Sequence, residues 1–221
     1  MTKPITYRFV ELLVECKDMD APLVFITRPK NSREIGHPRP VEYLFPRGTY
    51  TKRLSANTTQ DVDAFLHLDL PPHHYYYQQS EKATQFAKIV RKGSDWQATH
   101  EGIYDALILP MAKALEARKL AVKEIVKGHV HRAVWLFFPM VVLSGNLLSV
   151  KTGESPLKVV DRQRVTFVRE LQSEVVSGHY LTDFVRFDHL YKFIDTELMP
   201  FVERVAELAK QKPKLVRGDE A

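Results

Sequence analysis

The stretch RFVELLVECKDMD, residues 8–20, ends an apolar run on a carboxylate and an amine two positions apart, Glu15 and Lys17. Its residue types predict a β-strand that ends at Lys17. Side chains alternate along a strand, so Glu15 and Lys17 share one face with about 7 Å between their Cα atoms, and Cys16 lies on the other face. We expect the Cys16 thiol to be buried and inert.

The chemistry that these two groups suit is phosphodiester cleavage. That reaction uses a divalent cation held by carboxylates, which activates water, and a nearby positive charge that orients the water or stabilises the transition state. The segment APLVFIT, residues 21–27, follows a short turn and predicts a second strand beside the first.

With that second strand, LLVECKDMDAPLVFI resembles the Glu-x-Lys strand of the PD-(D/E)XK nuclease superfamily, in particular its restriction-endonuclease-like domains. QQSEKATQFAKIV, residues 78–90, is similar to the Gln-bearing helix that follows in such proteins. The resemblance implies a Mg²⁺- or Mn²⁺-dependent deoxyribonuclease in which Glu15 and the backbone carbonyl of Cys16 bind the metal and Lys17 is the catalytic amine. It also implies nucleic-acid contacts from Gln85 and Lys82, which would share one stripe of that helix.

The chain departs from this family upstream of the motif. The family has an acidic residue on a preceding strand, and a helix before that, whereas only residues 1–7 precede the motif strand here. Glu11 cannot replace the missing ligand, because four residues along a strand span about 13 Å. We therefore expect an N-terminally incomplete domain that binds its metal weakly, is inactive or impaired alone, and self-associates through an unpaired strand edge.

Composition sets wide limits on function. The 221 residues are 44% hydrophobic and carry a formal net charge of +5, which favours an anionic partner such as DNA. One cysteine and no leader-like start make a cytoplasmic chain the default. The most apolar segment, residues 133–150, contains Pro139 and a Ser-Gly-Asn turn, so it predicts a hairpin of two buried strands rather than a membrane span.

The remaining pattern predicts an α/β fold with a mixed β-sheet flanked by helices. Helical periodicity indicates helices over residues 80–90 and from Ser94, with a kink at Pro110 and an end at Gly128. Further expectations are a loop over 28–72 with a short helix near 60–66, strands over 164–171 and 178–187, and a final helix from Asp188 kinked at Pro200. We expect one domain over residues 1–211 and a solvated tail over 212–221.

Several patterns have a simpler explanation. Glu15 and Lys17 can be solvent-facing residues at a sheet edge, in which case the chain is a non-catalytic module that binds nucleic acid or a protein. The aromatics of PPHHYYY, residues 71–77, can stack on bases, although packing over the core edge is favoured. His129 and His131 have the spacing of zinc ligands on a strand, but a surface loop is favoured there too.

Overall fold

The computed structural model describes residues 6–31, 43–44, 49–55, 58–63, 74–100, 102–126, 132–153, 155–172, 174 and 176–211. The strands are β1 (Thr6–Lys17), β2 (Leu23–Pro29), β3 (Tyr43–Leu44), β4 (Thr49–Ser55), β5 (Thr58–Asp63), β6 (Glu81–Lys92), β7 (Asp95–Thr99), β8 (Arg132–Leu143), β9 (Leu147–Lys151), β10 (Val159–Arg162), β11 (Arg164–Gln172) and β12 (Ser177–Arg186). The helical segments are α3 (Tyr75–Gln78), α4 (Ile103–Val126), the 3-10 turn η2 (Phe187–His189), α5 (Leu190–Phe193), the π turn η3 (Ile194–Leu198) and α6 (Met199–Gln211). The expected α/β class with a mixed sheet is confirmed.

The main sheet consists of two halves joined at one point. Its order is β1-β8-β12-β11-β6-β2-β9-β10, with β3 paired to β8 and β7 to β6, while β4 and β5 form a separate hairpin. β1, β8 and β12 are mutually parallel, and β11 returns antiparallel to β12. β11 then meets β6 in a single parallel pair, Phe167 with Ala83. The strands beyond that bridge, β6, β2, β9 and β10, make the second half.

Two of the expected strand pairings, β1 with β2 and β8 with β9, are wrong for the same reason. β1 pairs with β8 and β2 pairs with β6 and β9, so β1 and β2 lie in different halves. The expected hairpin over residues 133–150 has its turn, but β8 and β9 also lie in different halves. The connections after β1 and after β8 cross between the halves side by side, where the Leu23 amide donates to the Asn146 carbonyl at 3.0 Å. β1 therefore pairs in parallel with β8, and β2 with β9, in place of the two expected pairings between strands adjacent in sequence.

One expected helix is a strand, and another begins later than expected. Residues 81–92 form β6. The first residues of the helix predicted from Ser94 form β7, which returns antiparallel beside β6, and the rest of that prediction is confirmed by α4. α4 begins only at Ile103 and continues through Pro110 without a break. The expected helix end near Gly128 lies outside the described residues. Of the short helix expected near 60–66, residues 60–63 belong to β5 and the others are outside the described part.

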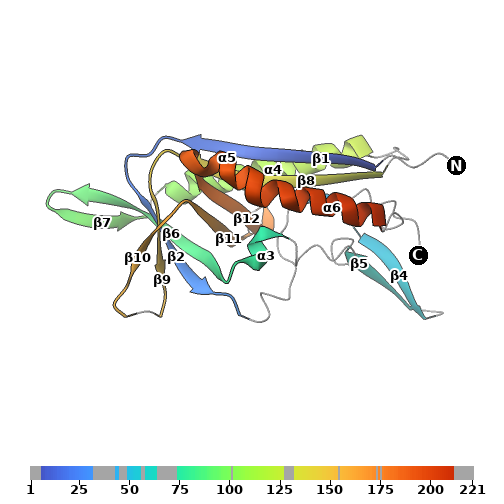
Figure 1. The fold of residues 1–221 in the computed structure, drawn as a ribbon, viewed down its shortest axis with the longest axis horizontal. Coiled ribbons are helices and arrows are strands. Elements are labelled where there is room, and N and C mark those ends of the chain that lie inside the picture. Colours follow the sequence, from blue (N-terminus) through green and yellow to red (C-terminus); the bar gives the residue numbers. More distant parts are fainter. Residues whose placement is uncertain are drawn as a thin grey trace.

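Two apolar cores cover the two faces of the first half-sheet. β8 shows the arrangement, because Trp135, Phe137 and Val141 face the core under α4 while Leu136, Phe138 and Met140 face the core under the C-terminal helices. Figure 1 shows α6 in front of these strands and α4 behind them. Burial on both faces explains why the strand is a nearly continuous apolar run.

The apolar residues of the C-terminal segment predict a buried stripe of Leu190, Phe193, Ile194, Phe201, Val202 and Val205. Phe193, Phe201, Val202 and Val205 are buried, whereas Leu190 and Ile194 are only half-buried. The segment also shows how the chain accommodates Pro200, which has no amide hydrogen to donate. The preceding turn widens into η3, where the Met199 amide donates to the Ile194 carbonyl five residues earlier. The wider turn is a recognised way to continue a helix past a missing donor.

Candidate functional site

Three parallel strands end level with one another, and their carboxyl ends form the candidate site. Lys17 of β1 pairs in register with Leu143 of β8, which pairs with Arg186 of β12. Neighbouring strands lie about 4.8 Å apart, so the Cα atoms of Lys17 and Arg186 are about 10 Å apart. In open α/β sheets, ligands bind beyond the carboxyl ends of parallel strands.

Glu15 and Lys17 contact each other on the face expected from strand alternation. The Lys17 Nζ and a Glu15 carboxylate oxygen are 2.7 Å apart, and the side chains are 40% and 33% exposed respectively. Leu13, two positions earlier on the same face, still packs against the α4 core. The pair therefore lies just past the edge of the covered surface, reachable by solvent and by a ligand.

Two hydrogen-bonded turns, one after β1 and one after β8, form a frame beside this pair. The Ser144 hydroxyl donates to Asp18 and accepts from the Met19 amide at 3.1 Å, and the Ser144 amide donates to the Lys17 carbonyl at 3.3 Å. Gly145 permits this approach, since a Cβ there would lie 2.5 Å from the Met19 carbonyl oxygen. Sequence analysis missed Ser144 and Gly145, whose only signal is the Ser-Gly-Asn turn.

Cys16 differs from its expected environment. Its side chain is exposed, so the expectation of a buried thiol is wrong, because the described helices leave the end of that face of β1 uncovered. The Lys17 carbonyl points toward β8, so alternation directs the Cys16 carbonyl to the opposite edge. β1 ends the strand order, and no described strand pairs with that edge. The carbonyl is therefore directed away from β8, at an edge that no described strand pairs with.

A complete metal site is absent from the described part of the chain, where no group of three or more His, Cys, Asp or Glu side chains is arranged to hold an ion. Glu11 shares the face of Glu15 but accepts from Arg118 at 2.6 and 2.8 Å and from the Trp135 indole at 2.8 Å. The Arg118 hydrogen bonds hold the pKa of the Glu11 carboxyl below its usual value. Glu11 is thus a structural carboxylate. The oxygen ligands that remain for an ion here are the Glu15 carboxylate and the Cys16 carbonyl.

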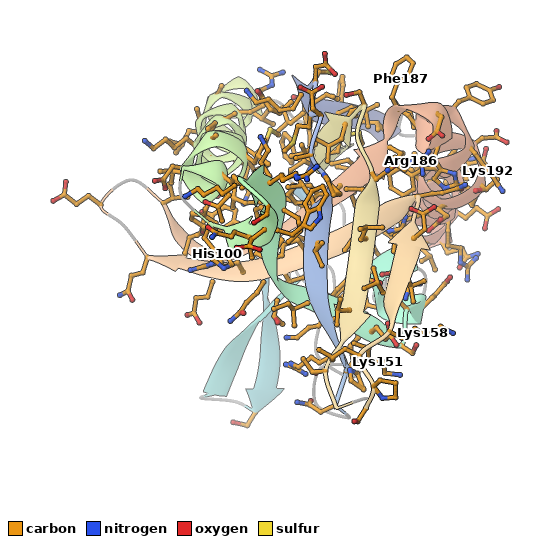
Figure 2. The ribbon with its side chains drawn as sticks, turned by 90° about the vertical axis from the view of Figure 1, so that its left-hand side faces the viewer. His100, Lys151, Lys158, Arg186, Phe187 and Lys192 are labelled. Carbon is orange, nitrogen blue, oxygen red and sulfur yellow. The ribbon has the colours of Figure 1, made fainter. Side chains whose placement is uncertain are left out.

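Exposed aromatic rings flank the site on the β12 side. Phe187 and Tyr191 are 72% and 82% exposed, one helical turn apart. Figure 2 views this end of the molecule and shows Phe187 projecting outward beyond Arg186, with Lys192 nearby. Arg186 is shared between Asp188 at 2.8 Å and Asp161 at 3.5 Å. Sequence analysis missed these residues, although DFVRFDHLY places two aromatics four apart outside the buried stripe.

Gln85 and Lys82 do not lie beside Glu15. They are on β6, with β8, β12 and β11 between, which corresponds to about 19 Å measured along the sheet. The helix stripe proposed for them does not exist, but a bulge at Thr84 places both side chains on one face of β6, since Lys82 pairs with Arg28 and Gln85 with Ile26. Lys82 lines a polar cleft, and Gln85 is exposed above a different one.

The tyrosines of residues 75–77 pack rather than stack on a ligand. Tyr75, Tyr76 and Tyr77 are buried in the core under the C-terminal helices, as the favoured alternative predicted. His74 caps α3, with its Nδ1 accepting from the Tyr76 amide at 3.1 Å, and burial with the nearby Arg164 and Lys30 charges lowers its pKa to about 3. His129 and His131 lie outside the described residues.

Asp183 is the centre of a buried polar network, made with Arg164, Thr166, Tyr75 and Glu197. Asp183 accepts from the Tyr75 and Thr166 hydroxyls, each at 2.6 Å, and from Arg164 at 3.3 Å. Arg164 also bonds Glu197. Burial, with the Asp183 charge, raises the pKa of the Tyr75 hydroxyl well above its usual value, which keeps it a donor. This network fixes the start of β11 against β12 and η3.

Comparison of the chain with protein-family models, with curated proteins and with solved structures gave no match. Within the described residues, no helix is both long and apolar enough to span a membrane.

Proposed function

We propose that the chain is a nuclease-like protein with a restriction-endonuclease-like fold that acts on DNA phosphodiesters with a divalent cation. The observation that supports this proposal is the Glu15–Lys17 pair, held on the frame of Ser144 and Gly145 at the level carboxyl ends of three parallel strands. The excess of positive charge favours a DNA partner, and we place the protein in the cytoplasm.

Each residue of the pair has a role that the geometry permits. Glu15 and the Cys16 carbonyl would hold Mg²⁺ or Mn²⁺, which supplies charge neutralisation and an activated water. Lys17 would leave the Glu15 carboxylate when that group holds the ion, and its ammonium would then orient the water or stabilise charge on the phosphate oxygens. Two oxygens bind a hard cation weakly, so this site needs further carboxylate ligands to work well.

The test combines metal binding with cleavage. Calorimetric Mn²⁺ titration of the full chain should show weak binding that Glu15→Gln abolishes. Supercoiled plasmid incubated at high protein concentration should be nicked only with Mg²⁺ or Mn²⁺, and Lys17→Ala should remove the nicking. Lys158→Ala deletes an exposed amine outside the carboxyl-end site (Figure 2) and serves as the control. Full activity in Lys17→Ala would exclude the catalytic role.

A non-catalytic module is the second candidate. The observation in its favour is that Glu15 and Lys17 neutralise each other and that the described residues supply no third metal ligand. This candidate predicts DNA binding without cleavage at any metal concentration. Binding measured by fluorescence anisotropy should weaken steeply with salt, with a log–log slope of about −0.9 per phosphate contacted. No binding at about 50 mM salt would exclude DNA as the partner for both candidates.

A further inference from the structure

The two halves of the sheet separate beside their single bridge and leave a polar cleft. β6 and β11 are paired only at Ala83 and Phe167, so their first residues diverge. A cleft of about 480 Å³ occupies the opening, within the size range of small-molecule sites. Its lining comes from the starts of β6 and β11, from the residues just before β6, and from β2, β9 and β10.

Buried hydroxyl groups line this cleft. Thr27 of β2, Ser149 of β9 and Thr166 of β11 are all buried, although each is a polar residue on a packed strand. On β2 and β9 the preceding residues of the same face are Phe25 and Leu147, which belong to the apolar core. The inward face of β2 and β9 therefore changes from apolar to polar at the cleft. Burying three hydroxyls there is favourable only where they have polar partners.

The side chains of Arg162 and Ser149 are hydrogen-bonded to each other, and both keep further N–H or O–H groups that could donate to a ligand. The Arg162 Nε donates to the Ser149 hydroxyl oxygen at 2.8 Å. The Ser149 hydroxyl hydrogen then needs an acceptor, and no described group accepts it. The Arg162 Nη2 lies 3.6 Å from Glu81, which is too long for a good hydrogen bond. Glu81 is held instead by Lys151 at 3.2 Å; Lys151 lies at the end of β9 (Figure 2).

Arg164 forms a fixed wall of the same cleft. Two carboxylates, Asp183 and Glu197, bind its guanidinium, which also lies over the rings of Tyr75 and Phe193 at 5.1 and 4.8 Å from their centroids. Both of its terminal nitrogens donate within the protein, so a ligand would be bound mainly by Arg162. Among the described residues that line the cleft, Lys82, Arg162 and Arg164 are cations and Glu81 is an anion.

We propose that this cleft binds a small phosphate ester that also carries hydroxyl groups, such as a sugar phosphate. The phosphate oxygens accept from the Arg162 guanidinium and the Ser149 hydroxyl, since arginine forms paired, charge-assisted hydrogen bonds with phosphate. The Glu81 carboxylate and the Gln78 and Gln79 amides line the cleft where the ligand's hydroxyls would lie. This proposal is independent of the nuclease proposal, because β1 contributes nothing to the cleft.

Calorimetry on the full chain tests it, with ribose 5-phosphate, inorganic phosphate and ribose as probes. Ribose 5-phosphate should bind, inorganic phosphate more weakly, and ribose not measurably. Arg162→Gln should weaken ribose 5-phosphate binding about 10-fold or more, as expected for loss of a charged hydrogen bond. Arg91→Gln, on the distant β6–β7 hairpin, should leave it unchanged, and thermal melting of both variants establishes that they are folded.

Two results would overturn the proposal. One is equal binding of ribose 5-phosphate by folded Arg162→Gln and Arg91→Gln, and the other is no binding of either phosphate probe at millimolar concentration. A short single-stranded oligonucleotide distinguishes the source of the phosphate. If it binds in an Arg162-dependent way while ribose 5-phosphate does not, the cleft is a nucleic-acid contact and the small-ligand assignment is wrong. Ser149→Ala should weaken phosphate binding less than Arg162→Gln does.

Discussion

The carboxyl-end pair and the Asp183 network use the same kinds of side chain in opposite settings. Glu15 and Lys17 are two residues apart in sequence and at least one-third exposed. Asp183 is 1% exposed and Arg164 is 11% exposed, and their partners come from α3, β11 and η3. The first arrangement is local and open to solvent, whereas the second is assembled from distant segments and closed.

The two arrangements therefore suit different roles: an exposed pair is available to a ligand, and a buried network stabilises the fold. An exposed ion pair contributes about 0–1 kcal/mol, so Glu15 and Lys17 can be rearranged by a ligand at small cost. A buried charge that loses its partner is strongly destabilising, because the remaining charge stays out of water. The Asp183 network therefore holds the half-sheet together, while the exposed pair is free to take part in chemistry.

The largest expected effect comes from breaking the Asp183 network. Asp183→Ala removes the acceptor of the buried Tyr75 and Thr166 hydroxyls and one of the two carboxylates that bind Arg164, and it should lower the free energy of unfolding by about 3–5 kcal/mol. Asp188→Ala removes an exposed carboxylate that pairs with Arg186, five residues past Asp183, and should cost less than about 0.5 kcal/mol. Urea unfolding of both variants measures the contrast. A loss below about 1 kcal/mol in Asp183→Ala would show that the network contributes little.

The frame beneath the exposed pair should be the next most sensitive. Gly145→Ala places a Cβ 2.5 Å from the Met19 carbonyl oxygen, so the two turns must separate. We expect a loss of about 1–3 kcal/mol, the usual cost of overpacking. Asn146→Ala, at the next position, keeps the backbone contacts and should cost less than about 0.5 kcal/mol. Equal stability of the two variants in thermal melts would mean that the turns adjust freely.

His74 gives the buried region a pH dependence. Its folded pKa of about 3 lies below the ordinary histidine value of about 6.5, so the unfolded chain binds more protons between these values. This contribution to stability is complete above about pH 6.5 and falls by up to about 1.4 kcal/mol per pH unit as the pH drops toward 3. His74→Asn keeps an acceptor for the Tyr76 amide and should flatten that slope in urea unfolding between pH 6 and 4.5. An unchanged slope would contradict the assignment.

The contrast also explains which parts of the fold the sequence predicts. β1, β2, β8, β11, β12 and the C-terminal helix were predictable because each has its pattern within one segment. β6 was misread because the bulge at Thr84 places Ala83 and Phe86 on one face, and that three-residue spacing imitates a helix. Gly93 has the positive φ that a helix end and a hairpin turn both require, so it did not distinguish them.

The candidate site likewise has residues that the sequence predicts and residues that it does not. Glu15 and Lys17 could be predicted because strand alternation alone places them together. The residues around them could not, since Ser144 and Arg186 reach the site only through parallel pairing across more than a hundred positions. For the same reason the Asp183 network has no signal in the sequence, where Tyr75, Arg164 and Asp183 are ordinary members of three separate elements.

The smallest expected effect on stability concerns the exposed pair itself. A double-mutant cycle with Glu15→Gln and Lys17→Met should give a coupling energy below about 1 kcal/mol that shrinks between about 50 mM and 1 M salt, because exposed charges are screened. The cycle of Asp183→Asn with Arg164→Met should give a larger coupling that salt hardly changes, since that pair is closed to solvent.

Millimolar Mn²⁺ sharpens the test. If Glu15 binds the ion, the Glu15–Lys17 coupling should disappear at saturating Mn²⁺, because the carboxylate then belongs to the metal. A Glu15–Lys17 coupling that Mn²⁺ leaves unchanged would assign the pair to the sheet edge as a surface ion pair and remove Glu15 as a metal ligand.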